Sequence, residues 1–282
     1  MNTFNAGSLF RRIAVALDDS MQSSQALQTA AELAASLQVE LEGIFFEDIN
    51  LIHLAELPFA REIRPASMTE ETVSAQRMEQ ELRSQALLQQ KKLELVAHEK
   101  GISCSFRIRR GQIRSELMAA VAEVDVLTLC RPIRMSEKFK QETIGFPLST
   151  VLPMQKANTS VSVIFGSAQN EKMALMVAVQ LAGRLDVEIR VLVTGDSDAE
   201  IDDLLREADT ILGTQKQRVS YIHLPGKQIS DLVIATASSN SRVLLVNSNN
   251  SIVAGGQLWP YLEQLSLPVL IIREQTAKTS NA

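Results

Sequence analysis

Apolar residues recur along this chain in short runs that are separated by longer stretches with one apolar face. Residues 12–17 and 39–46 are runs of strand type, and the second is apolar on both of its faces. A strand that is apolar on both faces is typical of a parallel sheet covered by helices on two sides. Between the two runs, small and apolar side chains share one face of a predicted helix: Leu27, Ala30, Ala31, Ala34 and Leu37.

The same alternation continues to the end of the chain and predicts an α/β fold with parallel sheets and right-handed crossovers. The further expected strands are 103–109, 126–130, 161–165, 188–194, 219–224, 243–247 and 269–272. The further expected helices are 72–100, 115–122, 171–185, 198–212 and 257–265. Gly101 follows the longest of these helices and is suited to a left-handed C-terminal cap.

Part of this pattern occurs twice, at an offset of 148 positions and without a gap. A repeat of this length predicts two similar α/β domains, which we place at 1–155 and 156–282. The first contains an insertion at 50–68 that has no counterpart in the second. Residues 161–165 could close the first domain or open the second. The matching pairs are Ala26/Ala174, Leu27/Leu175, Ala30/Ala178, Leu33/Leu181, Ala34/Ala182, Leu37/Leu185, Val39/Val187 and Glu40/Glu188.

The length, net charge and composition of the chain limit the classes of protein to which it can belong. The 282 residues leave room for two cores, and no apolar run reaches the roughly 18 residues of a membrane span. A net charge of −5 and 4% aromatic residues argue against nucleic-acid binding. Residues 1–8 lack a signal-peptide pattern, so we expect a cytoplasmic protein that is not embedded in a membrane. Cys104 and Cys130 are interpreted as buried free thiols.

The ends of the chain add a family resemblance. Residues 15–20 read Val-Ala-Leu-Asp-Asp-Ser, and residues 267–272 read Leu-Pro-Val-Leu-Ile-Ile. With the alanine-rich helix between the first two strands, they resemble a tandem universal stress protein. The resemblance implies two Rossmann-like domains of the adenine nucleotide α-hydrolase type, packed as an intramolecular pseudo-dimer. A homodimer, for example through an exposed strand at 269–272, remains an alternative.

The nucleotide-binding branch of that family carries Gly-x2-Gly-x9-Gly-Ser/Thr after its fourth strand, where glycine amides can surround phosphate. The first half departs from this pattern, because residues 131–135 read Arg-Pro-Ile-Arg-Met and residues 149–150 read Ser-Thr. In the second half, residues 247–251 read Asn-Ser-Asn-Asn-Ser, and only Gly255 and Gly256 remain. We therefore expect a degenerate nucleotide site in both halves.

The candidate ligand contacts lie where strands of such a fold end. By resemblance, Asp18 would face a nucleobase or ribose, and Gly166 stands at the matching position of the second half. Asp18 could instead cap the first helix, and an asparagine-rich turn also forms for backbone reasons alone. The ligand, if one is bound, would be ATP or another adenine nucleotide. The candidate residues are Ala16, Leu17, Asp18, Asp19, Asn247, Ser248, Asn249, Gly255 and Gly256.

The sequence contains no motif in which a nucleophile is paired with a general base. The spacing of the histidines His53, His98 and His223 is not that of metal ligands. Arg131 and Arg134 could bind phosphate or serve as solvated surface residues. We expect a non-enzymatic, stress-associated regulatory protein that acts by binding. The alternatives are a slow nucleotide hydrolase that uses a pocket at Asp18, and a soluble regulator that docks on a transporter. A protein partner could bind through residues 51–63.

Overall fold

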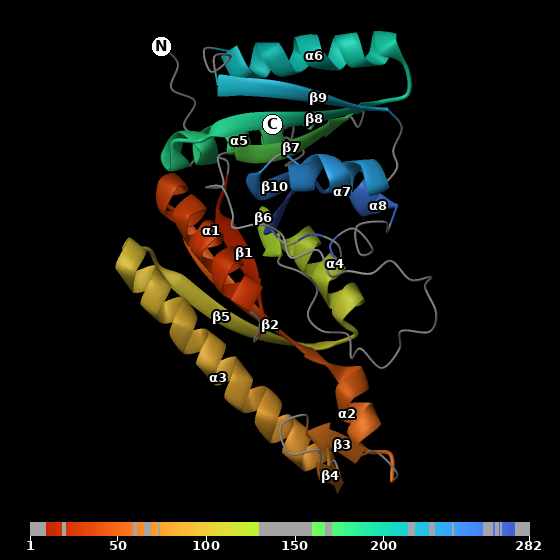
Figure 1. Cartoon of the computed structure of the whole chain (residues 1–282). Coiled ribbons are helices and arrows are strands. Elements are labelled where there is room, and N and C mark those ends of the chain that lie inside the picture. Colours follow the sequence, from red (N-terminus) through yellow and green to blue (C-terminus); the bar gives the residue numbers. More distant parts are fainter. Residues whose placement is uncertain are drawn as a thin grey trace, which may run out of the picture. The chain divides into compact units, whose positions relative to one another are not determined.

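Figure 1 shows a computed structural model of the whole chain. The chain divides into two compact units, one formed by Phe10–Thr128 and the other by the described part of Leu129–Ala282. The boundary predicted at 155/156 lies outside the described residues and stays a prediction, as does the packing of the two domains as a pair. The structure describes residues 10–18, 21–58, 61–64, 69–72, 74–129, 160–166, 171–213, 218–225, 229–238, 240–255, 262, 265 and 267–273.

The first unit is a parallel sheet with the strand order β5-β2-β1-β6. Helices α1 and α3 contact each other and cover one face (Figure 1). Helix α4 covers the other face: its acidic residues pair with Arg107 and Arg109 of β5, whereas Arg110, on the opposite side of that strand, pairs with α3. The elements are β1 (Arg12–Leu17), α1 (Met21–Leu37), β2 (Glu40–Asp48), α2 (Ile49–Ala55), β3 (Arg61–Arg64), β4 (Thr69–Thr72), α3 (Ala75–Lys100), β5 (Cys104–Gly111), α4 (Ile113–Glu123) and β6 (Val126–Leu129).

The second unit is a parallel sheet with the strand order β9-β8-β7-β10-β11. In chain order both sheets therefore begin 3-2-1-4, so the predicted parallel α/β architecture is confirmed in each unit. The elements are β7 (Ser160–Gly166), α5 (Lys172–Leu185), β8 (Glu188–Gly195), α6 (Asp198–Leu212), β9 (Val219–Pro225), α7 (Ile229–Ser238), β10 (Ser241–Asn247), α8 (Ser251–Ala254) and β11 (Val269–Ile272).

Strand β7 settles the open assignment of residues 161–165. It pairs with β8 along its whole length on one edge and with β10 on the other. A strand has only two hydrogen-bonding edges, and both edges of β7 are used within the second unit. The segment therefore opens the second unit and does not also close the first.

The insertion at 50–68 is more ordered than the sequence indicated. Helix α2 begins directly after β2, where the Asp48 side chain accepts a hydrogen bond from the Asn50 backbone N–H at 3.0 Å. The antiparallel pair β3–β4 follows. Helix α3 consequently begins at Ala75 rather than near Thr72, with Ser74 as its N-cap. Gly101 ends it with φ at 66°, so the predicted left-handed cap is confirmed.

The core of each unit lies between its sheet and its helices. The buried residues of α3 are Leu82, Ala86, Gln89, Leu93 and Ala97. Gly43 on β2 lets α3 approach closely, because a Cβ there would lie 2.6 Å from a methyl of Leu93. Within the described residues, no helix is both long and apolar enough to cross a bilayer. The helix expected at 257–265 falls mostly outside the described residues, and the short helix α8 precedes it.

Candidate functional site

The carboxyl ends of β7 and β10 form the point in the second unit where the chain turns to opposite sides of the sheet. Open α/β sheets place their ligands at such a switch point. Here a side chain of the protein already occupies it. The Glu171 carboxylate accepts a hydrogen bond from the Gly166 backbone N–H at 2.5 Å and another from the Asn250 side-chain amide at 2.9 Å. Glu171 thus connects the end of β7 to the turn after β10.

This connection is buried. Glu171 is 2% exposed and Asn250 is 3% exposed. Glu171 is the N-cap residue of α5, yet its side chain makes no capping hydrogen bond to that helix. The carboxylate is directed instead to the strand end and to the asparagine. Hydrogen bonds to a charged group are stronger than bonds between neutral groups, so this contact holds the switch point together.

The position of Gly166 at the end of β7 has no room for an aspartate side chain. It pairs with Thr194 of β8, and a Cβ added at Gly166 would lie 2.6 Å from Thr194 Oγ1. Real Cβ atoms do not approach other atoms this closely, so any larger residue would have to displace Thr194. At this position the second unit therefore has no side chain, and Thr194 lies where a Cβ would have to fit.

The predicted residues after β10 serve the turn itself. Asn247 is fully buried, and its side-chain oxygen accepts a hydrogen bond from the Asn249 N–H at 2.8 Å. Ser248 is half-buried, and its N–H donates to the carbonyl of Ile272 at 2.8 Å. Gly255 donates its N–H to the Ser251 carbonyl at 2.8 Å. These amides are engaged within the protein, as the backbone interpretation of the turn anticipated. Gly256 lies outside the described residues.

The matching position in the first unit is the end of β1. The Asp18 backbone N–H donates to the Ser23 hydroxyl at 3.1 Å, and Ser23 is buried. Asp18 is half-buried at this edge of the sheet, whereas the side chains of Ala16 and Leu17 lie in the core. Only their backbone could therefore meet a ligand. Asp19, Arg131 and Arg134 lie outside the described residues.

Two further carboxylates at this edge did not stand out in the sequence. Glu47 and Asp48 end β2 and are both buried. Glu47 pairs with Arg110 at 2.7 Å, and Arg110 also contacts Glu79 of α3 at 3.2 Å. These acceptors raise the pKa of Arg110, with the hydrogen bond to Glu47 as the main cause. The sequence did contain a signal for these two residues, because two acidic residues directly follow a long apolar run.

A chain of ion pairs crosses the α4 side of the first sheet. Arg109 binds both Glu116 and Glu123 of α4 at 2.8 Å. Arg107 binds Glu123 at 3.0 Å and approaches Glu42 of β2 at 3.1 Å, the latter without hydrogen-bond geometry. The hydrogen bond from Arg109 is the main cause that lowers the pKa of Glu123, and the same bond raises the pKa of Arg109. These contacts attach α4 to the edge strand.

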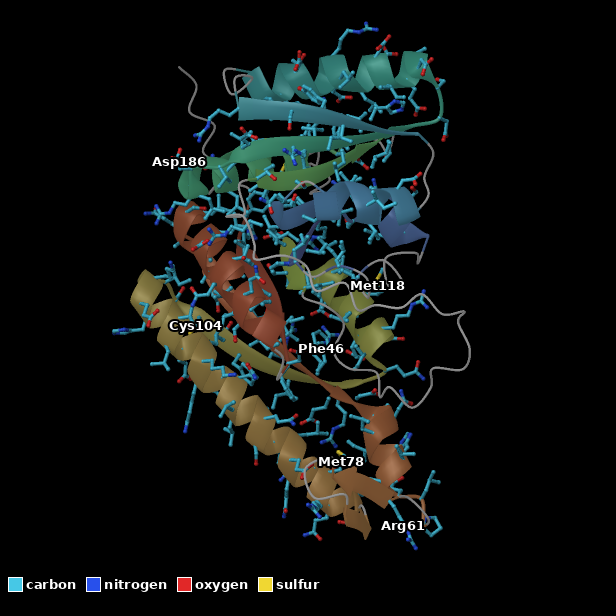
Figure 2. The ribbon with its side chains drawn as sticks, viewed as in Figure 1. Phe46, Arg61, Met78, Cys104, Met118 and Asp186 are labelled. Carbon is cyan, nitrogen blue, oxygen red and sulfur yellow. The ribbon has the colours of Figure 1, made fainter. Side chains whose placement is uncertain are left out.

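Cys104 lies at the start of β5, at the opposite end of the first sheet from Phe46 (Figure 2). Burial raises the pKa of its thiol, and Glu94 and Glu40 raise it further. Cys104 is a free thiol, as predicted, although it is only half-buried; Cys130 lies outside the described residues. In the part of the chain that the structure describes, no three His, Cys, Asp or Glu side chains are grouped as metal ligands.

Comparison with known proteins gives a result only at the level of structure. No protein-family model matches the chain, and no curated protein matches its sequence. A universal stress protein from Archaeoglobus fulgidus DSM 4304 superposes with a TM-score of 0.55 at 11% identity. That match covers 94% of this chain and 97% of the other. The fold is that of the universal stress proteins.

Two structures from Pseudomonas aeruginosa show the same similarity. A protein of unknown function from strain PAO1 has a TM-score of 0.50 at 14% identity and covers 95% of this chain and 94% of its own. A protein from strain UCBPP-PA14, provisionally assigned to the universal stress proteins, has a TM-score of 0.50 at 13% identity, and the match covers 95% of each chain. At such identities the similarity establishes a Rossmann-like α/β fold of the adenine nucleotide α-hydrolase type.

Proposed function

We propose that this chain is a cytoplasmic, non-enzymatic regulatory protein of the universal stress type, built from two copies of one binding domain. The observation that carries the proposal is the state of the carboxyl edges of the two sheets. Ser23, Asp48, Glu171 and Asn247 all use their polar side chains to bond the protein itself. Side chains that are engaged in this way stabilise the fold and are not positioned as catalytic groups. We therefore assign the chain a function in recognition rather than in chemistry.

The degenerate glycine pattern supports the same proposal. In nucleotide-binding relatives of this fold, the N–H groups of glycine residues are expected to donate hydrogen bonds to the phosphate oxygens. In the second unit the amides of Ser248 and Gly255 bond to carbonyls of the protein. We infer that tight binding of ATP by the second unit is lost. An adenine nucleotide remains a candidate ligand of the first unit, at Asp18.

Calorimetric titration with ATP, ADP and AMP tests the proposal, together with mass spectrometry of the purified protein for bound nucleotide. We expect no binding with a micromolar Kd and no turnover of ATP. The matched variants are Asp18→Ala and Asp202→Ala, the latter an exposed aspartate on α6. Micromolar binding that Asp18→Ala abolishes and Asp202→Ala preserves would contradict the degenerate site. ATP turnover lost in the same variant would favour the hydrolase.

A protein partner that binds through residues 51–63, for example a transporter, is a second proposal. Helix α2 buries Ile52 and Ala55, but Leu54 and Leu57 each remain 40% exposed. Exposed apolar side chains are a common feature of docking surfaces. Replacing both by serine should reduce partner recovery without changing the unfolding midpoint, because neither is in the core. Unchanged recovery of every partner by the double variant would exclude this surface.

A further inference from the structure

We infer that the switch point of the second unit is an anion-binding site occupied by the chain's own Glu171. This deepens the proposed function, because it names what fills the site of the second unit. It rests on the proposed function in one respect, namely that the switch point is a position for a ligand. The ligand class is a small carboxylate or another oxyanion of similar size. Glu171 acts as a built-in ligand that excludes free anions.

The donors of this site come from separate parts of the unit. Gly166 offers a backbone N–H at the end of β7, and Asn250 offers a side-chain amide from the turn after β10. Both donate to one carboxylate, one to each of its oxygens. Two convergent N–H donors on a buried oxyanion are the arrangement by which proteins bind carboxylate and phosphate groups.

The surroundings favour an anion over a neutral ligand. Glu171 immediately precedes α5, a helix of 14 residues whose N-terminus carries partial positive charge. Thr194 is 5% exposed and lies against Gly166, so the site is enclosed by β8 as well. A buried charge without donors would be strongly unfavourable, which makes the paired donors a requirement for this carboxylate.

The first unit shows what the same position holds without a built-in ligand. Ser23 and Glu171 are 148 positions apart, the offset of the sequence repeat. Each accepts a hydrogen bond from the backbone N–H five residues before it. Ser23 is short and neutral, so it satisfies the amide without bringing a charge to the switch point. The second unit has replaced that hydroxyl by a carboxylate.

Removal of the built-in ligand tests the inference. Glu171→Ala deletes a CH2–COO⁻ group, which has the size of acetate, and should lower the stability of the folded chain. Acetate or formate should then restore it, while chloride at equal ionic strength should not. At ten times its Kd, a bound anion multiplies the folding equilibrium constant by about tenfold. Inorganic phosphate, as a third arm, tells whether the site also accepts a larger oxyanion.

Three controls give each outcome a meaning. The wild-type chain should gain nothing from acetate beyond chloride, because its site is filled. Adding Asn250→Ala to Glu171→Ala should abolish the rescue. Glu200→Ala removes a comparable but exposed contact, in which the Glu200 carboxylate accepts from the Asp196 N–H at 2.7 Å, and should not be rescued. Equal rescue of Glu200→Ala, equal stabilisation of the wild type, or no rescue of Glu171→Ala would each overturn the inference.

A second measurement serves if Glu171→Ala does not fold in any of these buffers. Hydrogen exchange of the Gly166 amide should be slow in the wild-type chain, since this N–H is held by the carboxylate. In Glu171→Gln, which keeps the shape of the side chain but loses its charge, exchange should be faster by about tenfold or more. An unprotected Gly166 amide in the wild type would overturn the inference. Neither experiment uses a nucleotide, so its failure is separate from a failure at Asp18.

Discussion

The Ser23 hydroxyl accepts a hydrogen bond from the backbone N–H of Asp18 at 3.1 Å, across the turn that joins β1 to α1. Glu171 makes the corresponding bond to Gly166 in the second unit at 2.5 Å. One backbone requirement is thus met twice, by a hydroxyl and by a carboxylate. The two switch points therefore differ in one charged group: the second contains this carboxylate, and the first does not.

Ser23→Ala should destabilise the first unit, because the Asp18 N–H loses its hydrogen bond to the buried Ser23 hydroxyl. Loss of one such hydrogen bond costs about 0.5–1.5 kcal/mol. Urea unfolding of the whole chain measures the loss, with Ser24→Ala as the matched control on the exposed side of the same helix. The control should change the free energy of unfolding by less than about 0.5 kcal/mol. Equal effects of the two variants would show that the hydrogen bond is not important.

Gly166→Ala should destabilise the second unit by about 1–3 kcal/mol, because the new Cβ would collide with Thr194 Oγ1. Thr194→Ala removes that atom, so the double variant should lose less than the sum of the two single losses. A double-mutant cycle from denaturant unfolding measures this coupling. Gly183→Ala is the control, since nothing lies within 4 Å of a Cβ there. Strict additivity would contradict the steric account.

Thr128→Val should stabilise the first unit. The Thr128 hydroxyl is fully buried on β6 and has no hydrogen-bond partner among the residues that the structure describes. Replacing it by a methyl group of nearly the same shape removes an unpaired polar group and should add about 1 kcal/mol to the free energy of unfolding. Thr210→Val, on the exposed side of α6, is the matched control and should give no such gain. A loss of stability in Thr128→Val would mean that the hydroxyl is satisfied in solution.

Glu123 should make the stability of the first unit depend on pH in the acid range. The hydrogen bond from Arg109 lowers the pKa of Glu123 below its ordinary value in the folded chain, and Arg107 lowers it further. Its contribution is therefore complete above the unfolded pKa and is lost as the pH falls through the folded pKa. Because the side chain is 43% exposed, solvent screening keeps this contribution below about 1 kcal/mol.

Unfolding free energies between pH 6 and pH 3 check this dependence. Glu123→Gln should lose less stability than the wild type over that range. In the wild type, protonation of Glu123 breaks its ion pairs with the two arginines, whereas a glutamine is not protonated. Glu99→Gln, on the exposed end of α3, is the control and should follow the wild-type curve. Parallel curves for Glu123→Gln and the wild type would exclude the ion-pair chain as a source of acid sensitivity.

The sequence by itself determined the alternation of strands and helices, and thereby the parallel α/β class. Strand and helix periodicities are local, and the two halves carry them at the same offset, so β1 was predicted to the residue, β2 to within two residues, and the end of α1 at Leu37. The cap at Gly101 was also local, because a glycine after a long helical pattern favours a left-handed residue. Helix α2 and the β3–β4 pair were missed, since the insertion had no repeat to compare with.

Only the tertiary structure decided which strand edges are used and what fills the switch points. Residues 161–165 were ambiguous until both edges of β7 were seen to pair within the second unit. Glu171 was not singled out, although the repeat aligns it with Ser23, because sequence spacing does not show that its carboxylate meets Asn250, 79 positions away. Periodicity is a property of neighbouring residues, whereas a hydrogen bond between distant side chains exists only once the folded sheet brings them together.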